Sequence, residues 1–196
     1  MNGVQLILNE IKSMMEDFFE TCSEQNGVLR SIAEHLGVTD VSAIVDVAME
    51  MIGDEEAPYP VLHFLITLAK DVPGDCVKEI KEALHDLNLA IAVGEYPSFG
   101  SFCYTPELDQ IFLSYRMPVN TAAAENELIN IRYYFGMLYE QMDLFADFIM
   151  FLCDNNGQLP KLKDYLDYLD EVTDLNDLET RALLLKEKLS ALFEKG

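Results

Sequence analysis

Hydrophobic positions recur every three or four residues near both ends of the chain, and this spacing predicts helices. Residues 4–24 carry such a face, made of Leu8, Ile11, Met15, Phe18, Phe19 and Cys22. Residues 28–36 repeat the spacing over a shorter stretch, which predicts a second helix that Gly37 ends. The strongest pattern begins near Thr121 and predicts one long helix ending at residues 155–157. Its face is Leu128, Ile131, Phe135, Leu138, Met142, Phe145, Ile149 and Leu152.

The middle of the chain follows the shorter period of strands. Residues 41–52 alternate apolar and polar side chains, which predicts a half-buried strand. A helix is the alternative there, because Ala, Met and Glu favour helices. Pro60 opens the apolar run 61–69, which predicts a central strand in a hairpin with the preceding one.

A helix over residues 76–91 follows, and Gly94 separates it from two more strands. These strands are predicted over residues 98–104 and 110–117, and Pro118 ends the second because it has no N–H for the ladder. The pattern predicts an α+β fold, with an antiparallel sheet of about four to five strands packed against helices. The expected order is α-α-β-β-α-β-β-α with a C-terminal helical appendage.

The tail contains two more amphipathic stretches. The first has the stripe Leu162, Tyr165, Leu169 and Val172. The second follows a coiled-coil-like spacing through Leu175, Leu178, Ala182, Leu185, Leu189 and Leu192. It spans too few heptads to stand alone, so we expect it to pack on its own domain, with exchange between two subunits as the alternative. We therefore expect an α+β domain over 1–155 and an appendage over 156–196.

Charge narrows the possible partners. The chain has 35 acidic and 13 basic residues and a net charge of −22, which disfavours nucleic acid and anionic lipid. A solvated acidic surface and a basic partner are both compatible with this charge. The N-terminus lacks a basic signal-peptide region, and no apolar run is long enough to span a bilayer, so we expect a cytoplasmic protein without membrane contact.

Motifs that carry chemistry are missing from the sequence. The three histidines, His35, His63 and His85, are far apart, and none lies three or four residues from another His or from Cys. The pair His85-Asp86 has no nucleophile beside it, and the sequence contains no phosphate-binding loop or nucleophile elbow. We therefore expect no catalytic, cofactor-binding or metal-binding residues and no enzymatic activity. A pocket in which His85 and Asp86 converge with Cys or Tyr would favour an enzyme.

A family resemblance rests on three motifs within residues 60–150. They are Leu84-His85-Asp86-Leu87-Asn88 at a helix end, Gly94 followed by Phe99, Phe102 and Tyr104, and the strand Ile111-Phe112-Leu113-Ser114-Tyr115-Arg116 leading to Met117-Pro118-Val119. This region resembles the YbjN-like family, which shares the fold of type III secretion chaperones. The chain departs from the family pattern in the longer spacing between Gly94 and Phe99 and in the two-helix tail.

The resemblance implies a chaperone-like, non-enzymatic module that holds an extended segment of a partner protein. The partner would be another protein with an apolar or basic segment, and a homodimer is possible. No cofactor is expected. The candidate partner-binding residues, expected at exposed strand positions, are Phe102, Tyr104, Phe112 and Leu113. The alternative function is an acidic stoichiometric inhibitor or immunity-type protein that covers a basic partner by charge.

Overall fold

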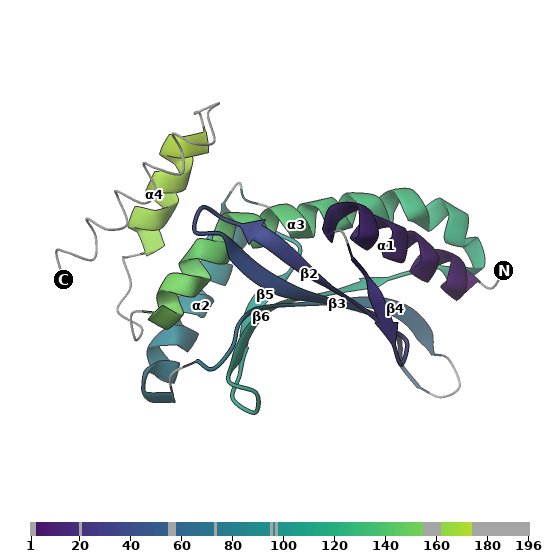
Figure 1. The fold of residues 1–196 in the computed structure, drawn as a ribbon, viewed down its shortest axis with the longest axis horizontal. Coiled ribbons are helices and arrows are strands. Elements are labelled where there is room, and N and C mark those ends of the chain that lie inside the picture. Colours follow the sequence, from purple (N-terminus) through teal and green to yellow (C-terminus); the bar gives the residue numbers. More distant parts are fainter. Residues whose placement is uncertain are drawn as a thin grey trace.

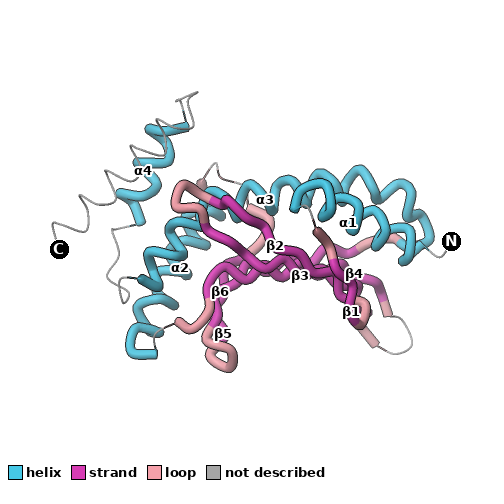
Figure 2. Tube along the Cα trace, in the orientation of Figure 1, coloured by secondary structure: helices cyan, strands magenta, loops and turns pink. Residues whose placement is uncertain are grey.

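A six-stranded antiparallel sheet forms the middle of the fold, and α1 and α3 lie side by side over one of its faces (Figure 1). The computed structural model describes residues 3–19, 21–54, 58–72, 74–94, 96, 98–154 and 162–173. The strands occur in the order β1-β2-β3-β4-β6-β5, so the hairpin of the last two strands joins the sheet beside β4. Figure 2 shows the same division, with α1 and α3 above the strands and α2 at their left.

The strands are β1 (Ser23–Gln25), β2 (Val28–Leu36), β3 (Val41–Ile52), β4 (Tyr59–Ala69), β5 (Ser101–Thr105) and β6 (Gln110–Pro118). The helices are α1 (Gly3–Phe19), α2 (Val77–Val93), α3 (Ala124–Asp154) and α4 (Leu162–Thr173). Short 3-10 turns, η1 (Gly74–Cys76) and η2 (Thr121–Ala123), lead into α2 and α3.

The core lies between the sheet and the helices. Along β3 the odd-numbered residues from Val41 to Val47 are buried, whereas the even-numbered ones are exposed or half-buried. This alternation follows from the pleat, which points successive side chains to opposite faces. Ile131, Phe135 and other residues of α3 complete the core from the helical side.

The structure confirms the predicted α+β class, the antiparallel sheet and a C-terminal helix. The helix predicted over residues 28–36 is wrong, because these residues form β2, which pairs with β3. With β1 the sheet has six strands, more than the four to five expected. Residues 41–52 are a strand, which excludes the helical alternative.

Side chains of α3 fasten two loops to the helical layer. The buried Gln141 accepts hydrogen bonds from the N–H groups of Phe99 and Gly100 and donates one to the Gly100 carbonyl. The buried Asp147 accepts hydrogen bonds from the turn between β2 and β3, and Asp143 accepts one from the N–H of Gly37. The two halves of the sheet are therefore held by one helix.

The described part of the appendage packs on the main domain. Tyr165 of α4 is buried, its hydroxyl donates to the Leu144 carbonyl at 2.7 Å, and its ring contacts Phe148. The second tail helix, predicted from Leu175 to Leu192, lies outside the described residues. None of the helices in the described part of the chain combines the length and apolarity needed to cross a membrane.

Candidate functional site

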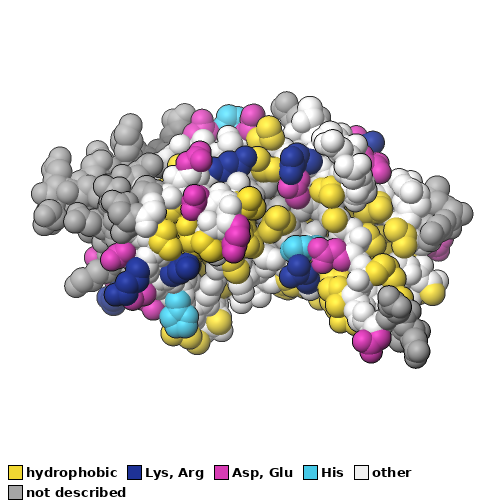
Figure 3. Space-filling view, turned by 90° about the horizontal axis from the view of Figure 1, so that it is seen from below, with side chains coloured by type: hydrophobic (Ala, Val, Ile, Leu, Met, Phe, Trp, Pro, Cys, Tyr) yellow, Lys and Arg dark blue, Asp and Glu magenta, His cyan; other side chains and the backbone are white. Residues whose placement is uncertain are grey.

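The sheet has a second face, which no helix of the described residues covers and which is concave (Figure 1). We call it the open face, and Figure 3 shows that hydrophobic, acidic and basic side chains are interspersed on this side of the molecule. It is defined by the side chains that point away from the helices: Arg30, Ile32, Ile44, Asp46, Glu50, His63, Leu65, Thr67, Cys103, Phe112, Ser114 and Arg116.

Strand register places an uncharged line of side chains across this face. Ile32 pairs with Ile44, Ile44 with Thr67, Thr67 with Phe112, and Phe112 with Cys103. We call these five residues the cross-strand row. Four strand spacings separate its ends, a span of about 19 Å. Ile32 is 50% exposed. Ile44 and Thr67 also line a cleft of about 660 Å³ at the start of β3 and the end of β4, whose lining includes Met150 and Phe151 of α3.

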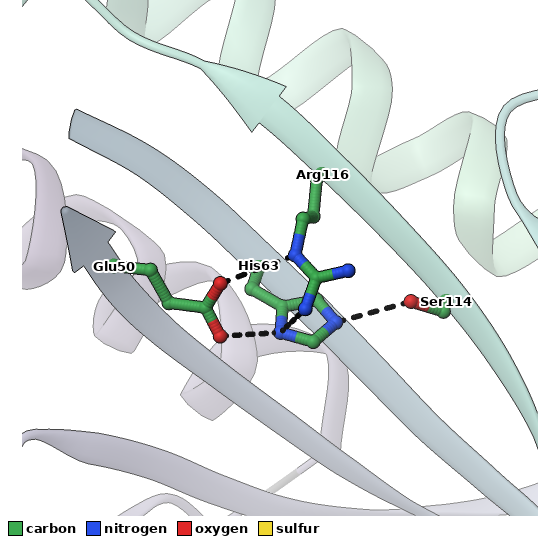
Figure 4. Close-up of polar contacts among 4 residues, drawn as sticks. All are labelled: Glu50, His63, Ser114 and Arg116. Carbon is green, nitrogen blue, oxygen red and sulfur yellow. Dashed lines mark hydrogen bonds and ion pairs between the residues drawn. The ribbon is translucent and has the colours of Figure 1, made fainter. Parts of the chain in front are cut away.

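A polar cluster occupies the neighbouring part of the open face, where β3, β4 and β6 run together (Figure 4). Nδ1 of His63 lies 2.7 Å from Oε1 of Glu50, and Nε2 lies 3.0 Å from the Ser114 hydroxyl. Arg116 donates from Nε to Oε2 of Glu50 at 3.1 Å. The sheet register brings these four residues together from positions 50 to 116 of the chain.

The charge of Glu50 determines how the histidine is oriented. Partial burial would raise the pKa of Glu50, but hydrogen bonds from His63 and Arg116 and their charges lower it below its ordinary value. An ionised Glu50 can only accept, so a proton on Nδ1 of His63 satisfies this contact and leaves Nε2 to the Ser114 hydroxyl. Nη2 of Arg116 lies 3.4 Å from the same Nδ1.

This order of groups is that of a serine, histidine and carboxylate triad, but one component is lacking. Acyl transfer also needs donors directed at the developing oxyanion. Ser114 lies in β6, which has β4 on one side and β5 on the other, so the N–H groups of β6 are used in the ladder. The positively charged side chain of the cluster is Arg116, which is about half exposed.

Ion pairs leave the centre of the open face close to neutral. Arg30 forms a two-pronged pair with Asp46, at 2.6 and 2.7 Å. Arg116 forms an ion pair with Glu50 through a single contact, from Nε to Oε2. Burial raises the pKa of the Cys103 thiol, so the thiol stays protonated and weakly nucleophilic at neutral pH. The face therefore offers apolar groups and compensated charges.

The expected exposure of the four candidate residues is wrong for two of them. Phe102 and Leu113 are 2% and 1% exposed and belong to the core. Tyr104 is half-buried on the helix side, where its hydroxyl donates to Asp109 and its ring lies beneath Lys81. Phe112 alone of the four lies on the open face, half-buried. No observation tests partner binding by any of the four.

Other predicted chemistry does not converge. His85 and Asp86 are both exposed on α2, and no group of three or more His, Cys, Asp or Glu side chains suited to a metal occurs among the described residues. The sequence reasoning missed Glu50, His63 and Ser114 as a group. The alternation of side chains along each strand could have indicated them, because all three occupy positions that point away from the helices.

Comparisons of the chain with protein-family models, with curated proteins and with solved structures found no match. The resemblance to YbjN-like proteins therefore stays a prediction.

Proposed function

We propose that the protein is a non-enzymatic binding module that holds a segment of another protein against the open face. The observation that carries this proposal is the cross-strand row, an uncharged line on a sheet face without a covering helix in the described chain. Ile32 of this row is half exposed, Thr67 is buried, and the other three side chains are half-buried. An apolar surface rimmed by polar groups is typical of a protein-binding site.

Two features support the proposal that the open face binds a partner and is not simply a solvent-exposed surface. The face is concave, so it can surround a convex partner (Figure 1). Its arginines are already paired with Asp46 and Glu50, so a partner can contact the row without leaving unpaired charges beneath it. The second candidate function, a charge-driven inhibitor, is favoured by the net charge of −22.

The test is affinity capture with matched variants in lysate of the source organism. We expect a protein partner that the wild type retains at high salt and that Phe112→Ser and Ile44→Ser lose. Ile129→Ser serves as the control, because Ile129 is 77% exposed on α3, away from the open face. Circular dichroism checks that each variant is folded.

The two candidate functions give different outcomes. A partner that dissociates at high salt and is indifferent to Phe112 would support the inhibitor, because exposed charge pairs are screened by salt. A capture that no open-face substitution changes would reject the binding module. Light scattering of the purified chain tests the expected homodimer at the same time.

A further inference from the structure

The β5 edge of the sheet offers little to an extended partner. A strand that adds to a sheet needs a row of free N–H and C=O groups at an edge. At the β5 edge, Asn88 of α2 already donates to the Phe102 carbonyl and accepts from the Phe102 N–H, both at 2.8 Å. At the opposite edge, β1 has three residues and pairs only with Val28–Arg30, so the described chain places no strand beside residues 31–36 of β2. An extended partner could add to the sheet there, at its edge and not on the open face.

The open face is unfavourable to an extended chain, for a reason of backbone hydrogen bonding. The peptide groups of β3, β4 and β6 are already paired within the sheet. An extended segment lying on their side chains would bury its own N–H and C=O groups without partners, which costs free energy. A helix satisfies those groups internally and can present a purely apolar stripe.

The dimensions and charges of the face point to the same occupant. The cross-strand row spans about 19 Å, which matches an apolar stripe of about 13 helical residues. One side of the row faces the sheet end at which β2, β4 and β5 terminate. Exposed acidic residues occupy the turns at this end: Asp40, Asp71, Glu107 and Asp109. A helix lying along the row would therefore have carboxylates along one flank.

We infer that the open face binds an amphipathic helix of another protein, with its apolar stripe on the cross-strand row and lysines or arginines on the flank that faces these acidic turns. This inference rests on the proposed function and specifies its partner. The helix axis crosses the strands, and Ile44 and Phe112 contact the middle of the apolar stripe.

The test uses two synthetic peptides of about 18 residues, made of Leu and Lys in equal numbers. In one, the Leu residues occupy positions i, i+3, i+4 and i+7 of each repeat, so it is amphipathic as a helix; in the other, Leu and Lys alternate, so it is amphipathic as a strand. We expect the full chain to bind the first peptide at least about tenfold more tightly. Phe112→Ser should weaken that binding about tenfold, while Ile129→Ser leaves it unchanged.

Three outcomes would overturn the inference. Equal or tighter binding of the alternating peptide would indicate an extended occupant. If high salt weakens the binding of both peptides equally and Phe112→Ser has no effect, the binding is due to charge alone. A dimer of the free chain that Phe112→Ser dissociates would make a second copy the occupant. The capture experiment tests the proposed function independently of the peptides. A captured partner that binds the open face through an extended segment would contradict the helical occupant but support the proposed function.

Discussion

Asp147 on α3 supplies the acceptors for Thr39 in the turn between β2 and β3. Its Oδ1 accepts from the backbone N–H of Thr39 at 2.9 Å and from the Thr39 hydroxyl, and its Oδ2 accepts from the N–H of Val38 at 2.8 Å. The carboxylate is 2% exposed, so these donors replace the water it would otherwise bind. The turn and the helix are thereby tied together through one side chain.

Removing this carboxylate should destabilise the fold. Asp147→Ala leaves two N–H groups and a hydroxyl of a partly exposed turn without their acceptor, at a cost of about 1–3 kcal/mol. Asp147→Asn should cost less, because one acceptor oxygen remains. Urea unfolding measures both changes, with the exposed Asp86→Ala on α2 as control. A loss no larger than that of the control would contradict the role of Asp147.

Gly37 should tolerate alanine less well than Gly27. Both have positive φ, +63° and +78°, so alanine is strained at either position. A Cβ on Gly37 would lie 2.6 Å from an oxygen of Asp147, whereas nothing lies within 4 Å of one on Gly27. We expect Gly27→Ala to cost about 1 kcal/mol and Gly37→Ala at least about 1 kcal/mol more. Equal unfolding midpoints would show that the turn moves freely away from α3.

Asn88 should protect the β5 edge. Asn88→Ala frees the N–H and carbonyl of Phe102, so we expect a stability loss of about 1–2 kcal/mol and concentration-dependent self-association. Light scattering over a dilution series measures association. Asn88→Asp, which keeps an acceptor for the N–H, is the matched comparison. A monomer at every concentration would show that Asn88 does not guard this edge.

Glu50 should make stability depend on pH in the acidic range. Its pKa in the folded chain is below its ordinary value of about 4.3, so its ionisation stabilises the folded state above that pH. This contribution is lost as the pH falls through about 4.3 toward the folded pKa. The stability difference between wild type and Glu50→Gln should therefore shrink from about pH 6 to about pH 3. Glu34→Gln on β2 is the control, and a constant difference would refute the coupling.

Ser114 should not react as a catalytic serine. His63 and Glu50 lie in the right order, but the paired backbone around Ser114 offers no oxyanion donors. We expect a fluorophosphonate probe to leave the native chain unlabelled, as judged by intact mass. Labelling at Ser114 that His63→Ala abolishes would establish a nucleophile and reject the non-enzymatic proposal.

In β2 the buried residues are not all hydrophobic and the hydrophobic residues are not all buried. The spacing of its hydrophobic residues therefore predicted a helix. The inward residues Leu29 and Ala33 flank Ser31, a buried polar side chain whose hydroxyl donates to the Thr21 carbonyl. Ile32, by contrast, points outward and is half exposed. A shift in register then returns Leu36 to the core. Elsewhere the period of three to four predicted α2 and α3, and the period of two predicted β3, because their apolar residues do face the core. The strand at residues 61–69 was predicted from its continuous apolar run.

Parity within strands explains what was missed at the site. Phe112 and Leu113 are neighbours in β6, so their side chains point to opposite faces and both cannot contact one partner. The choice between faces depends on which side the helices cover, and that is a tertiary property. The meeting of Glu50, His63 and Ser114 depends further on the register of three strands, which the local pattern does not encode.

The turn at residues 37–39 takes its acceptors from Asp143 and Asp147, more than 100 positions later in the chain. A ribosome makes the turn well before it makes its partners. Local folding of β2 and β3 can begin early, but their turn cannot reach its native hydrogen bonding until α3 has emerged. The N-terminal half of the sheet is therefore completed late in synthesis, and the growing chain depends on α3 for the native turn between β2 and β3.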